Sequence, residues 1–239
     1  MNTLYDAQTI LLDADDTLWE NNVYYERAFE EFVDVLDHAH LSPSEVRQVL
    51  DRFEMANGFG ARAFAQSLVD TFSELAGRND DATIKQVERL GLQILEIEME
   101  IIPGVEETLS SLRPHHDLFL FTKGDLKEQQ LKIQRPGIGH YFDAHIVAAD
   151  KKVHTYTELV DAFGLDPEQT WMIGNSPKSD IRPALEAGIH AVFIPHAMTW
   201  HLEHVDIEHN PEWRGRFAEI ERFEALTTLF QHTPQETMP

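Results

Sequence analysis

The sequence predicts an α/β fold: a doubly wound, Rossmann-like parallel-sheet core with a helical bundle inserted after its first strand. In the second half of the chain, short apolar runs alternate with segments of helical periodicity, which is typical of a parallel sheet that helices cover on both faces. Between the first apolar run and that half, the periodicity is helical throughout and indicates a bundle of about four helices. We expect a core domain of residues 1–20 and 103–239 and a helical domain of residues 21–102.

The strands are predicted from short apolar runs that are rich in strand-forming residues. The first run, TILL at residues 9–12, ends directly before Asp13. The later runs are LFLF at 118–121, AHIVAA at 144–149, TWMIG at 170–174 and AVFIP at 191–195. Because these runs are continuously apolar, we expect strands that are buried on both faces of the sheet.

The helices are predicted from the spacing of apolar side chains. In the inserted block this spacing covers residues 25–36, 64–75 and 84–101. Another helix begins at SPSE, residues 42–45, which is a capping box with Pro43 at the first helical position. Between the later strands we expect helices that end near residue 113, cover 125–134 and 153–163, and run from near Ser179 to Glu186.

The composition excludes several classes of function. Acidic residues outnumber basic ones 42 to 19, which gives a formal net charge of −23. Such a field repels nucleic acids and anionic membranes, so we expect neither as a partner. The chain has no cysteine, which excludes disulfides, thiolate metal sites and cysteine nucleophiles. The first residues show no signal-peptide pattern and no apolar run is long enough to cross a bilayer, so we expect a cytoplasmic location.

Polar side chains follow four of the predicted strands. These residues are Asp13 and Asp15 after the first run, Thr122 after the second, Lys151 and Lys152 after the third, and Asn175 and Asp180 after the fourth. Because ligands of open parallel sheets bind at the carboxyl ends of the strands, we expect all of them around one pocket.

These residue types suit the transfer of a phosphoryl group. A carboxylate can attack phosphorus and form an aspartyl phosphate, and a second carboxyl beside it can protonate the leaving alcohol and then deprotonate water. Asp13 and Asp15 are two residues apart and point the same way if the strand geometry persists. Crowded carboxylates also suit Mg²⁺, which removes their mutual repulsion. A hydroxyl such as Thr122 and an ammonium such as Lys151 can hold the phosphoryl oxygens.

Four segments resemble, in order, the four motifs of the haloacid dehalogenase-like (HAD) hydrolases. They are DADDT (13–17), LFLFTKGD (118–125), the lysine in AADKKVHTY (148–156) and WMIGNSPKSD (171–180). The resemblance covers residues 6–22 and 103–195. It implies a phosphatase of the C1-capped subgroup, in which the helical insertion is the cap. The dehalogenases of the family do not keep the second aspartate of the first motif, so Asp15 favours phosphoryl transfer over carbon–halogen cleavage.

The resemblance also implies catalytic roles. Asp13 is similar to the family's nucleophile and Asp15 to its general acid/base. Thr122 resembles the hydroxyl that binds the phosphoryl group, and Lys151 resembles the lysine that neutralises its charge. Lys152 stays an alternative, although Lys151 fits better the family's spacing to the following aromatic residue.

The metal ligands that the resemblance implies are Asp13, Asp15 through its backbone carbonyl, Asn175 and Asp180, around Mg²⁺. The position of Asn175 more often carries aspartate, so a neutral ligand there weakens metal binding or leaves Asp180 to contribute more. Asp16 stands where the family often has glycine, and we assign it no catalytic role.

Candidates for contacts with the substrate are Thr17, Trp19, Lys123 and Gly124. Trp19 either contacts the leaving group or packs between core and cap. Gly124 either offers its backbone N–H to phosphate or simply forms a turn. We expect the substrate to be a small phosphorylated metabolite, selected by the cap and by the segment at 196–204.

Two other functions fit the same motifs. One is a sugar phosphomutase, because a capped core of this kind also returns phosphate to sugar hydroxyls. The other is a non-catalytic, phosphate-binding regulatory protein, which the neutral Asn175 suggests. The sequence leaves both a monomer and a homodimer open.

The segment PHAMTWHLEHVDIEH, residues 195–209, contains four histidines. Their spacing matches no common zinc pattern, and we do not expect a zinc site there. Because the segment leaves the last predicted strand at the pocket end of the sheet, we expect His196 or Trp200 to line the pocket entrance.

Overall fold

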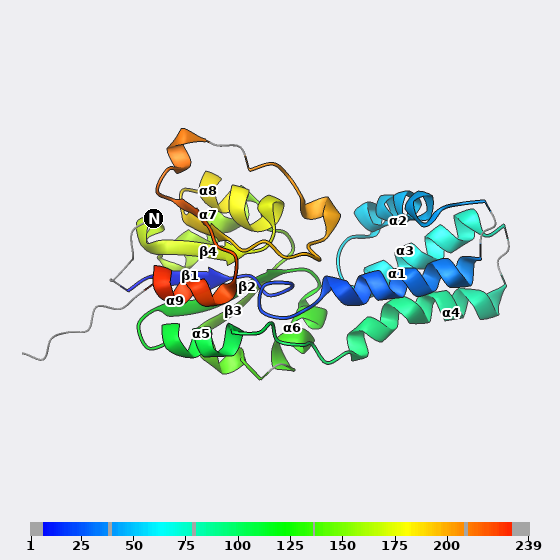
Figure 1. The fold of residues 1–239 in the computed structure, drawn as a ribbon, viewed down its shortest axis with the longest axis horizontal. Helices are drawn as coiled ribbons and strands as arrows, with labels where there is room; N and C mark the ends of the chain where they lie inside the picture. Colours follow the sequence, from blue (N-terminus) through cyan, green and yellow to red (C-terminus); the bar gives the residue numbers. More distant parts are fainter. Residues whose placement is uncertain (1–6, 38–39, 78–79, 136, 208–209, 231–239) are drawn as a thin grey trace, which may run out of the picture. The chain divides into compact units, whose positions relative to one another are not determined.

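The computed structural model describes residues 7–37, 40–77, 80–135, 137–207 and 210–230. The chain separates into two compact units (Figure 1). The first, which we call the core unit, comprises Met1–Glu20 and Met99–Pro239, and the second, the helical unit, comprises Asn21–Glu98. The helical unit therefore ends ahead of the boundary at residue 102 that the sequence predicts.

The core unit contains a parallel sheet of six strands in the order β3-β2-β1-β4-β5-β6. Its strands are β1 (Thr9–Leu12), β2 (Asp117–Lys123), β3 (Ala144–Ala148), β4 (Thr170–Gly174), β5 (His190–Phe193) and β6 (Phe217–Glu219). β1 lies in the middle, with Leu12 opposite both Leu120 of β2 and Ile173 of β4. The predicted α/β class and the five predicted strands are confirmed.

Helices cover both faces of this sheet (Figure 1). They are α5 (Val105–Leu112), α6 (Leu126–Gln134), α7 (Val153–Phe163), α8 (Arg182–Glu186) and α9 (Leu226–Leu229). On the face of α7 and α8, Leu11, Phe121 and Met172 form one buried cluster with Tyr156. On the other face, the Trp171 ring packs edge-on against a phenylalanine just after α9. Strands with apolar side chains on both faces are buried in this way because each face has its own helical layer.

The structure differs from the prediction made from the sequence in three places. β6 was not predicted, and it extends the sheet beyond β5. The segment predicted to begin a helix near Ser179 is a π-helical turn, Pro177–Ile181, that precedes α8. The helical spacing predicted up to residue 101 ends earlier, because a 3₁₀ turn follows at Gln93–Glu96 and Ile101 pairs with Trp19 in a β-bridge.

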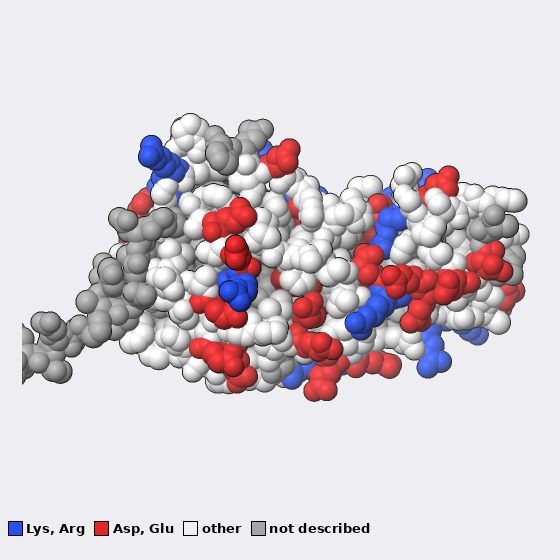
Figure 2. Space-filling model, viewed as in Figure 1, with Lys and Arg blue, Asp and Glu red and all other residues white. Residues whose placement is uncertain are grey.

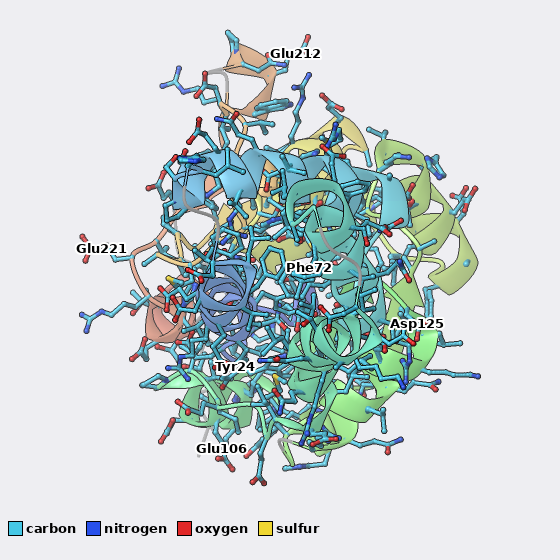
Figure 3. All side chains as sticks on the ribbon, turned by 90° about the vertical axis from the view of Figure 1, so that its right-hand side faces the viewer. Tyr24, Phe72, Glu106, Asp125, Glu212 and Glu221 are labelled. Carbon is cyan, nitrogen blue, oxygen red and sulfur yellow. The ribbon has the colours of Figure 1, made fainter. Side chains whose placement is uncertain are left out.

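The helical unit contains the helices α1 (Asn22–Leu36), α2 (Pro43–Asn57), α3 (Ala61–Leu75) and α4 (Asp81–Leu92). The predicted capping box begins α2, where the Ser42 hydroxyl and the Glu45 backbone and side chain bond reciprocally. The apolar stripes are core packing, with Leu68 and Phe72 fully buried, and Figure 3 shows Phe72 among the helices.

One glycine allows the close contact between α3 and α4. A Cβ atom on Gly91 would lie 2.5 Å from the Cα atom of Ala65. Since real Cβ atoms essentially never approach backbone so closely, the two helices can pack at this distance only because position 91 has no side chain.

The surface reflects the acidic composition. On the face shown in Figure 2, acidic side chains are spread over the surface of each unit, and basic ones stand between them. Among the described residues, no helix combines the length and the apolar composition that crossing a bilayer requires.

Candidate active site

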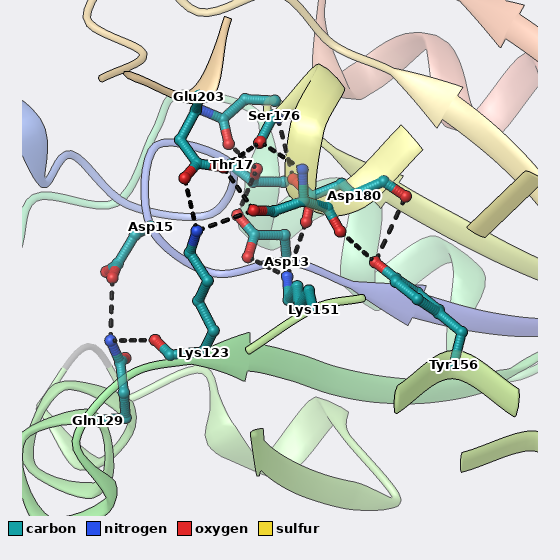
Figure 4. A network of polar contacts seen from close by, with 12 residues as sticks. Asp13, Asp15, Thr17, Lys123, Gln129, Lys151, Tyr156, Ser176, Asp180 and Glu203 are labelled. Carbon is teal, nitrogen blue, oxygen red and sulfur yellow. Dashed lines mark hydrogen bonds and ion pairs between the residues drawn. The ribbon is translucent and has the colours of Figure 1, made fainter. Parts of the chain in front are cut away.

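The carboxyl end of β1 carries the buried carboxylate of Asp13. Its backbone N–H donates to the Ile173 carbonyl oxygen at 2.9 Å, which continues the pairing of β1 with β4. The Lys151 ammonium donates to Asp13 Oδ1 at 2.5 Å and to Asp180 Oδ1 at 2.8 Å (Figure 4). The Thr17 hydroxyl lies 3.1 Å from Asp13 Oδ2. One cluster therefore joins residues from three of the four motifs.

The two candidate lysines differ sharply in position. Lys151 is 3% exposed and lies between two carboxylates. The side chain of Lys152 is 70% exposed and pairs with Asp150, outside the cluster. The structure brings only Lys151 of this pair to the carboxylates.

Electrostatics in this cluster favour an additional positive charge. Burial, and then the charge of Asp180, raise the pKa of Asp13 to about 7, although Lys151 acts in the opposite direction. Burial lowers the pKa of Lys151, but the two carboxylates more than reverse this effect and keep the ammonium protonated. The single positive charge of Lys151 does not balance the negative charges of two ionised aspartates, Asp13 and Asp180. A bound cation would supply the missing positive charge.

Asp180 is placed by the turn after β4. The backbone N–H of Ser176 donates to Asp180 Oδ2 at 2.9 Å, and the Tyr156 hydroxyl from α7 donates to the Ser179 carbonyl at 2.8 Å. A Cβ atom on Gly174 would lie 2.2 Å from Asp180 Oδ2. The absence of a side chain at the end of β4 is therefore what makes room for this carboxylate.

Asn175 lies between the carboxylates and a neighbouring pocket. Its side-chain oxygen is 3.3 Å from the Thr17 hydroxyl, and its amide donates to the Thr199 hydroxyl at 2.8 Å. The Thr17 hydroxyl thus lies between Asn175 and Asp13 rather than in open space. The carboxylates of Asp13 and Asp180 and the amide oxygen of Asn175 form an oxygen-rich donor set, which suits a hard cation such as Mg²⁺.

The carboxylate of Asp15 is held by Trp19 and by two residues of α6 that no motif in the sequence marks. The Lys132 ammonium from α6 lies 3.0 Å from both carboxylate oxygens, and Gln129 Nε2 donates at 3.0 Å. The indole N–H of Trp19 donates to Asp15 at 2.9 Å. Burial raises the pKa of Asp15, but Lys132, with help from the other two donors, lowers it overall. Asp15 is therefore ionised here.

Three further residues that the sequence predicts at the site are Thr122 on β2, Gly124 in the turn after it, and Trp19 after β1. The register of Leu12 with Leu120 places Thr122, which is buried, at the same sheet edge as the end of β1. Gly124 has a φ of 132° and its N–H donates to the Ala148 carbonyl, so the geometry favours a turn over a phosphate contact. Trp19 is fully buried, which favours packing over contact with a leaving group.

Lys123 is engaged by a residue from a distant segment. Its ammonium donates to Glu203 Oε1 at 2.7 Å and to the Ser179 hydroxyl at 2.8 Å. Glu203 lies in a 3₁₀ turn, His201–Glu203, after β5. Its other oxygen accepts from Ser176 and Ser179 hydroxyls at 2.6 and 2.5 Å. No motif or periodicity in the sequence marks this glutamate.

The histidine-rich segment also lies beside the site. His196 and His204 line a pocket of about 440 Å³ together with Asn175 and Thr199. His196 also approaches Asp16 and Glu20, and the potential ligand atoms of these three side chains lie within 4.8 Å of one another. Asp16 has a φ of 58°, a conformation that aspartate tolerates better than most residues. His209 lies outside the described residues.

Comparisons with known proteins identify the family to which the chain is similar. The model of the haloacid dehalogenase-like hydrolase family matches residues 7–188. N-acylneuraminate-9-phosphatase of Rattus norvegicus is 31% identical over 98 residues, which are 39% of this chain and 40% of that protein. Phosphoserine phosphatase of Thermus thermophilus is 30% identical over 115 residues, 46% of this chain and 45% of that protein. The chain thus matches less than half the length of these curated relatives.

The likeness to a solved structure extends much further. The structure of a haloacid dehalogenase-like family hydrolase from Xanthomonas campestris superimposes with a TM-score of 0.79 and 30% sequence identity. The superposition covers 92% of this chain and 93% of that one.

Proposed function

Because the chain belongs to the haloacid dehalogenase-like hydrolases, we propose that it is a Mg²⁺-dependent phosphatase that hydrolyses a small phosphorylated metabolite. The observation that carries the proposal is the pairing of the buried Asp13 with Lys151, which also contacts Asp180. A carboxylate nucleophile has to be desolvated and still be kept beside positive charge, and this arrangement does both.

The residues support a reaction in two halves. Asp13 attacks phosphorus, an aspartyl phosphate forms, and the bond from phosphorus to the leaving oxygen breaks while Asp15 donates a proton to that oxygen. Asp15 then takes a proton from water, the water oxygen attacks phosphorus, and Asp13 is released together with inorganic phosphate. The ion pair with Lys132 keeps Asp15 in the form that the second half needs. The proton that Asp15 takes from water in one turnover is the one that it donates to the leaving oxygen in the next.

Mg²⁺ would be held by the carboxylates of Asp13 and Asp180, the side-chain oxygen of Asn175 and the backbone carbonyl of Asp15. When bound, it would offset the negative charge of these groups and of the phosphoryl oxygens. Burial is the main cause of the raised pKa of Asp13, and the charge of Asp180 adds to it, so a cation bound between the two carboxylates would favour the ionised form of Asp13. Thr122 and Lys151 would hold the non-bridging oxygens of the phosphoryl group.

The helical unit is proposed as the cap that selects the substrate. The residues assigned above act on the phosphoryl group, which all phosphomonoesters share. Discrimination among metabolites therefore has to come from other parts of the chain, and the inserted unit Asn21–Glu98 is the largest of these. The names of two matched relatives, N-acylneuraminate-9-phosphatase and phosphoserine phosphatase, support a small metabolite as substrate without selecting one.

A panel assay tests the proposal. The purified protein is incubated with metabolite phosphates and with an aryl phosphate, in Mg²⁺ or in EDTA, and released phosphate is measured. We expect turnover in Mg²⁺ alone, loss of turnover in Asp13→Asn, and normal turnover in Asp161→Asn, which changes an exposed aspartate of α7. Hydrolysis that persists in EDTA or in Asp13→Asn contradicts the mechanism. Rapid isomerisation of a sugar phosphate with little free phosphate indicates a mutase instead, and binding of phosphate without turnover indicates a regulatory protein.

A further inference from the structure

Glu203 connects two of the loops that form the proposed phosphoryl site. One carboxylate oxygen accepts from Lys123, directly after Thr122 on β2. The other accepts from the hydroxyls of Ser176 and Ser179, in the turn that carries the metal-binding aspartate after β4. Figure 4 shows the Glu203 carboxylate above Lys123 and beside Ser176. A single side chain thus fixes groups from two strands that are not neighbours in the sheet.

The contacts of Glu203 are those of a buried and ionised group. The residue is 6% exposed, and burial alone would raise its pKa, but Lys123 and the two serine hydroxyls lower it overall. A buried carboxylate with three donors is held in one orientation, because loss of any donor would leave a desolvated charge less well satisfied.

The segment that carries Glu203 is itself fastened to the turn after β4. Lys178 donates to the Leu202 carbonyl oxygen at 3.0 Å, and Asn175 donates to the Thr199 hydroxyl at 2.8 Å. Together with the contacts of Glu203, these bonds tie residues 199–203 to residues 175–179 along their length.

We propose that Glu203 is a positioning residue of the phosphoryl site, which fixes the Lys123 ammonium and the Ser176–Ser179 turn and offsets the charge of Lys123 so that phosphate can leave. This inference rests on the proposed function. Inorganic phosphate is the product of the reaction, and each uncompensated positive charge near its site strengthens its binding. With Glu203 in place, the Lys123–Glu203 pair is neutral, and its net attraction for phosphate is small.

The two charges of the pair have opposite effects, and this gives a sharp test. Glu203→Gln removes the negative charge that Glu203 places 2.7 Å from the Lys123 ammonium. The Kd of inorganic phosphate should therefore fall by about tenfold, and kcat and KM should both fall as product release slows. Lys123→Gln leaves the negative charge alone, so the Kd should rise by about tenfold. The double variant is neutral at both positions and should return to within about twofold of the parent.

The measurement is calorimetric titration of the folded, full-length protein with inorganic phosphate in Mg²⁺, repeated without added metal. Glu219→Gln, an exposed glutamate on β6, is the matched control and should bind phosphate as the parent does. If the Kd of phosphate shifts in the same direction in both single variants, or does not shift in Glu203→Gln, the inference is overturned. If the pair had a purely structural role, removing either of its members would weaken phosphate binding. If Glu203→Gln does not fold, Lys123→Gln decides alone, and an unchanged Kd overturns the inference.

The outcomes also separate this inference from the proposed function. Opposite shifts in phosphate affinity without hydrolysis of any ester would reject the phosphatase and keep the role of Glu203. Hydrolysis in Mg²⁺ without opposite shifts would reject the role of Glu203 and keep the phosphatase.

Discussion

Glu54 on α2 is expected to make the stability of the helical unit depend on pH. Its side chain is 9% exposed, and its Oε2 atom has no hydrogen-bond partner among the described residues. Burial raises its pKa from 4.5 to about 7; Arg47 opposes the shift, and the charges of Asp51 and Glu26 add to it. The ionised form is therefore disfavoured in the folded state.

The sign and size of the effect follow from proton linkage. Between pH 4.5 and 7 the folded state binds more protons at Glu54 than the unfolded state does, so stability falls as the pH rises through this range. A shift of this size corresponds to about 3 kcal/mol in the free energy of unfolding. Glu54→Gln cannot ionise, so the variant should gain up to about 3 kcal/mol over the parent at pH 8 and little near pH 5.

Urea unfolding of the parent and variant at pH 5 and pH 8 measures this difference. All four tryptophans, at 19, 171, 200 and 213, belong to the core unit, so fluorescence follows that unit alone. The transition of the helical unit is then the part of the far-ultraviolet circular dichroism that fluorescence does not reproduce. Glu30→Gln, an exposed glutamate of α1, is the control and should show no such dependence. A difference between Glu54→Gln and the parent that is equal at both pH values would refute the reasoning.

Three further predictions concern the core unit. Gly174→Ala should lower the affinity for Mg²⁺ by at least about tenfold, measured by titration, because a Cβ atom 2.2 Å from Asp180 Oδ2 has to displace the carboxylate; unchanged affinity contradicts the assigned ligand. Lys151→Met should reduce kcat by about a thousandfold or more, whereas Lys152→Met, at an exposed side chain, should stay within about twofold of the parent. Lys132→Met removes the charge that lowers the pKa of the proposed acid/base, so the acidic limb of the pH–rate profile should move to higher pH; a limb that does not move argues against that role.

Much of the fold could be predicted because apolar runs along the chain indicate which segments are buried. Residues 9–12 and 170–174 are predicted and observed strands with the same bounds, since continuous apolar runs leave a central strand no solvent-exposed face. The edge strand β6 is only three residues long and partly exposed, so no apolar run marks it. The π-helical turn at 177–181 escaped prediction because the residue pattern does not distinguish its backbone hydrogen bonds, such as that from the Ile181 N–H to the Ser176 carbonyl oxygen, from those of an α-helix.

For the candidate site, too, one part could be predicted from the sequence and another part could not. The sequence by itself determined which polar residues follow the strands, and parallel strands bring such residues to one edge whatever the helices do. Only the tertiary structure decided their partners: Lys132 at Asp15, and Glu203 at Lys123. Periodicity encodes which side of an element is buried, but a buried charge is satisfied by whichever group the packing of distant segments delivers within hydrogen-bond reach. The distance between a buried charge and its partner is a property of the folded chain, and the order of the residues does not specify it.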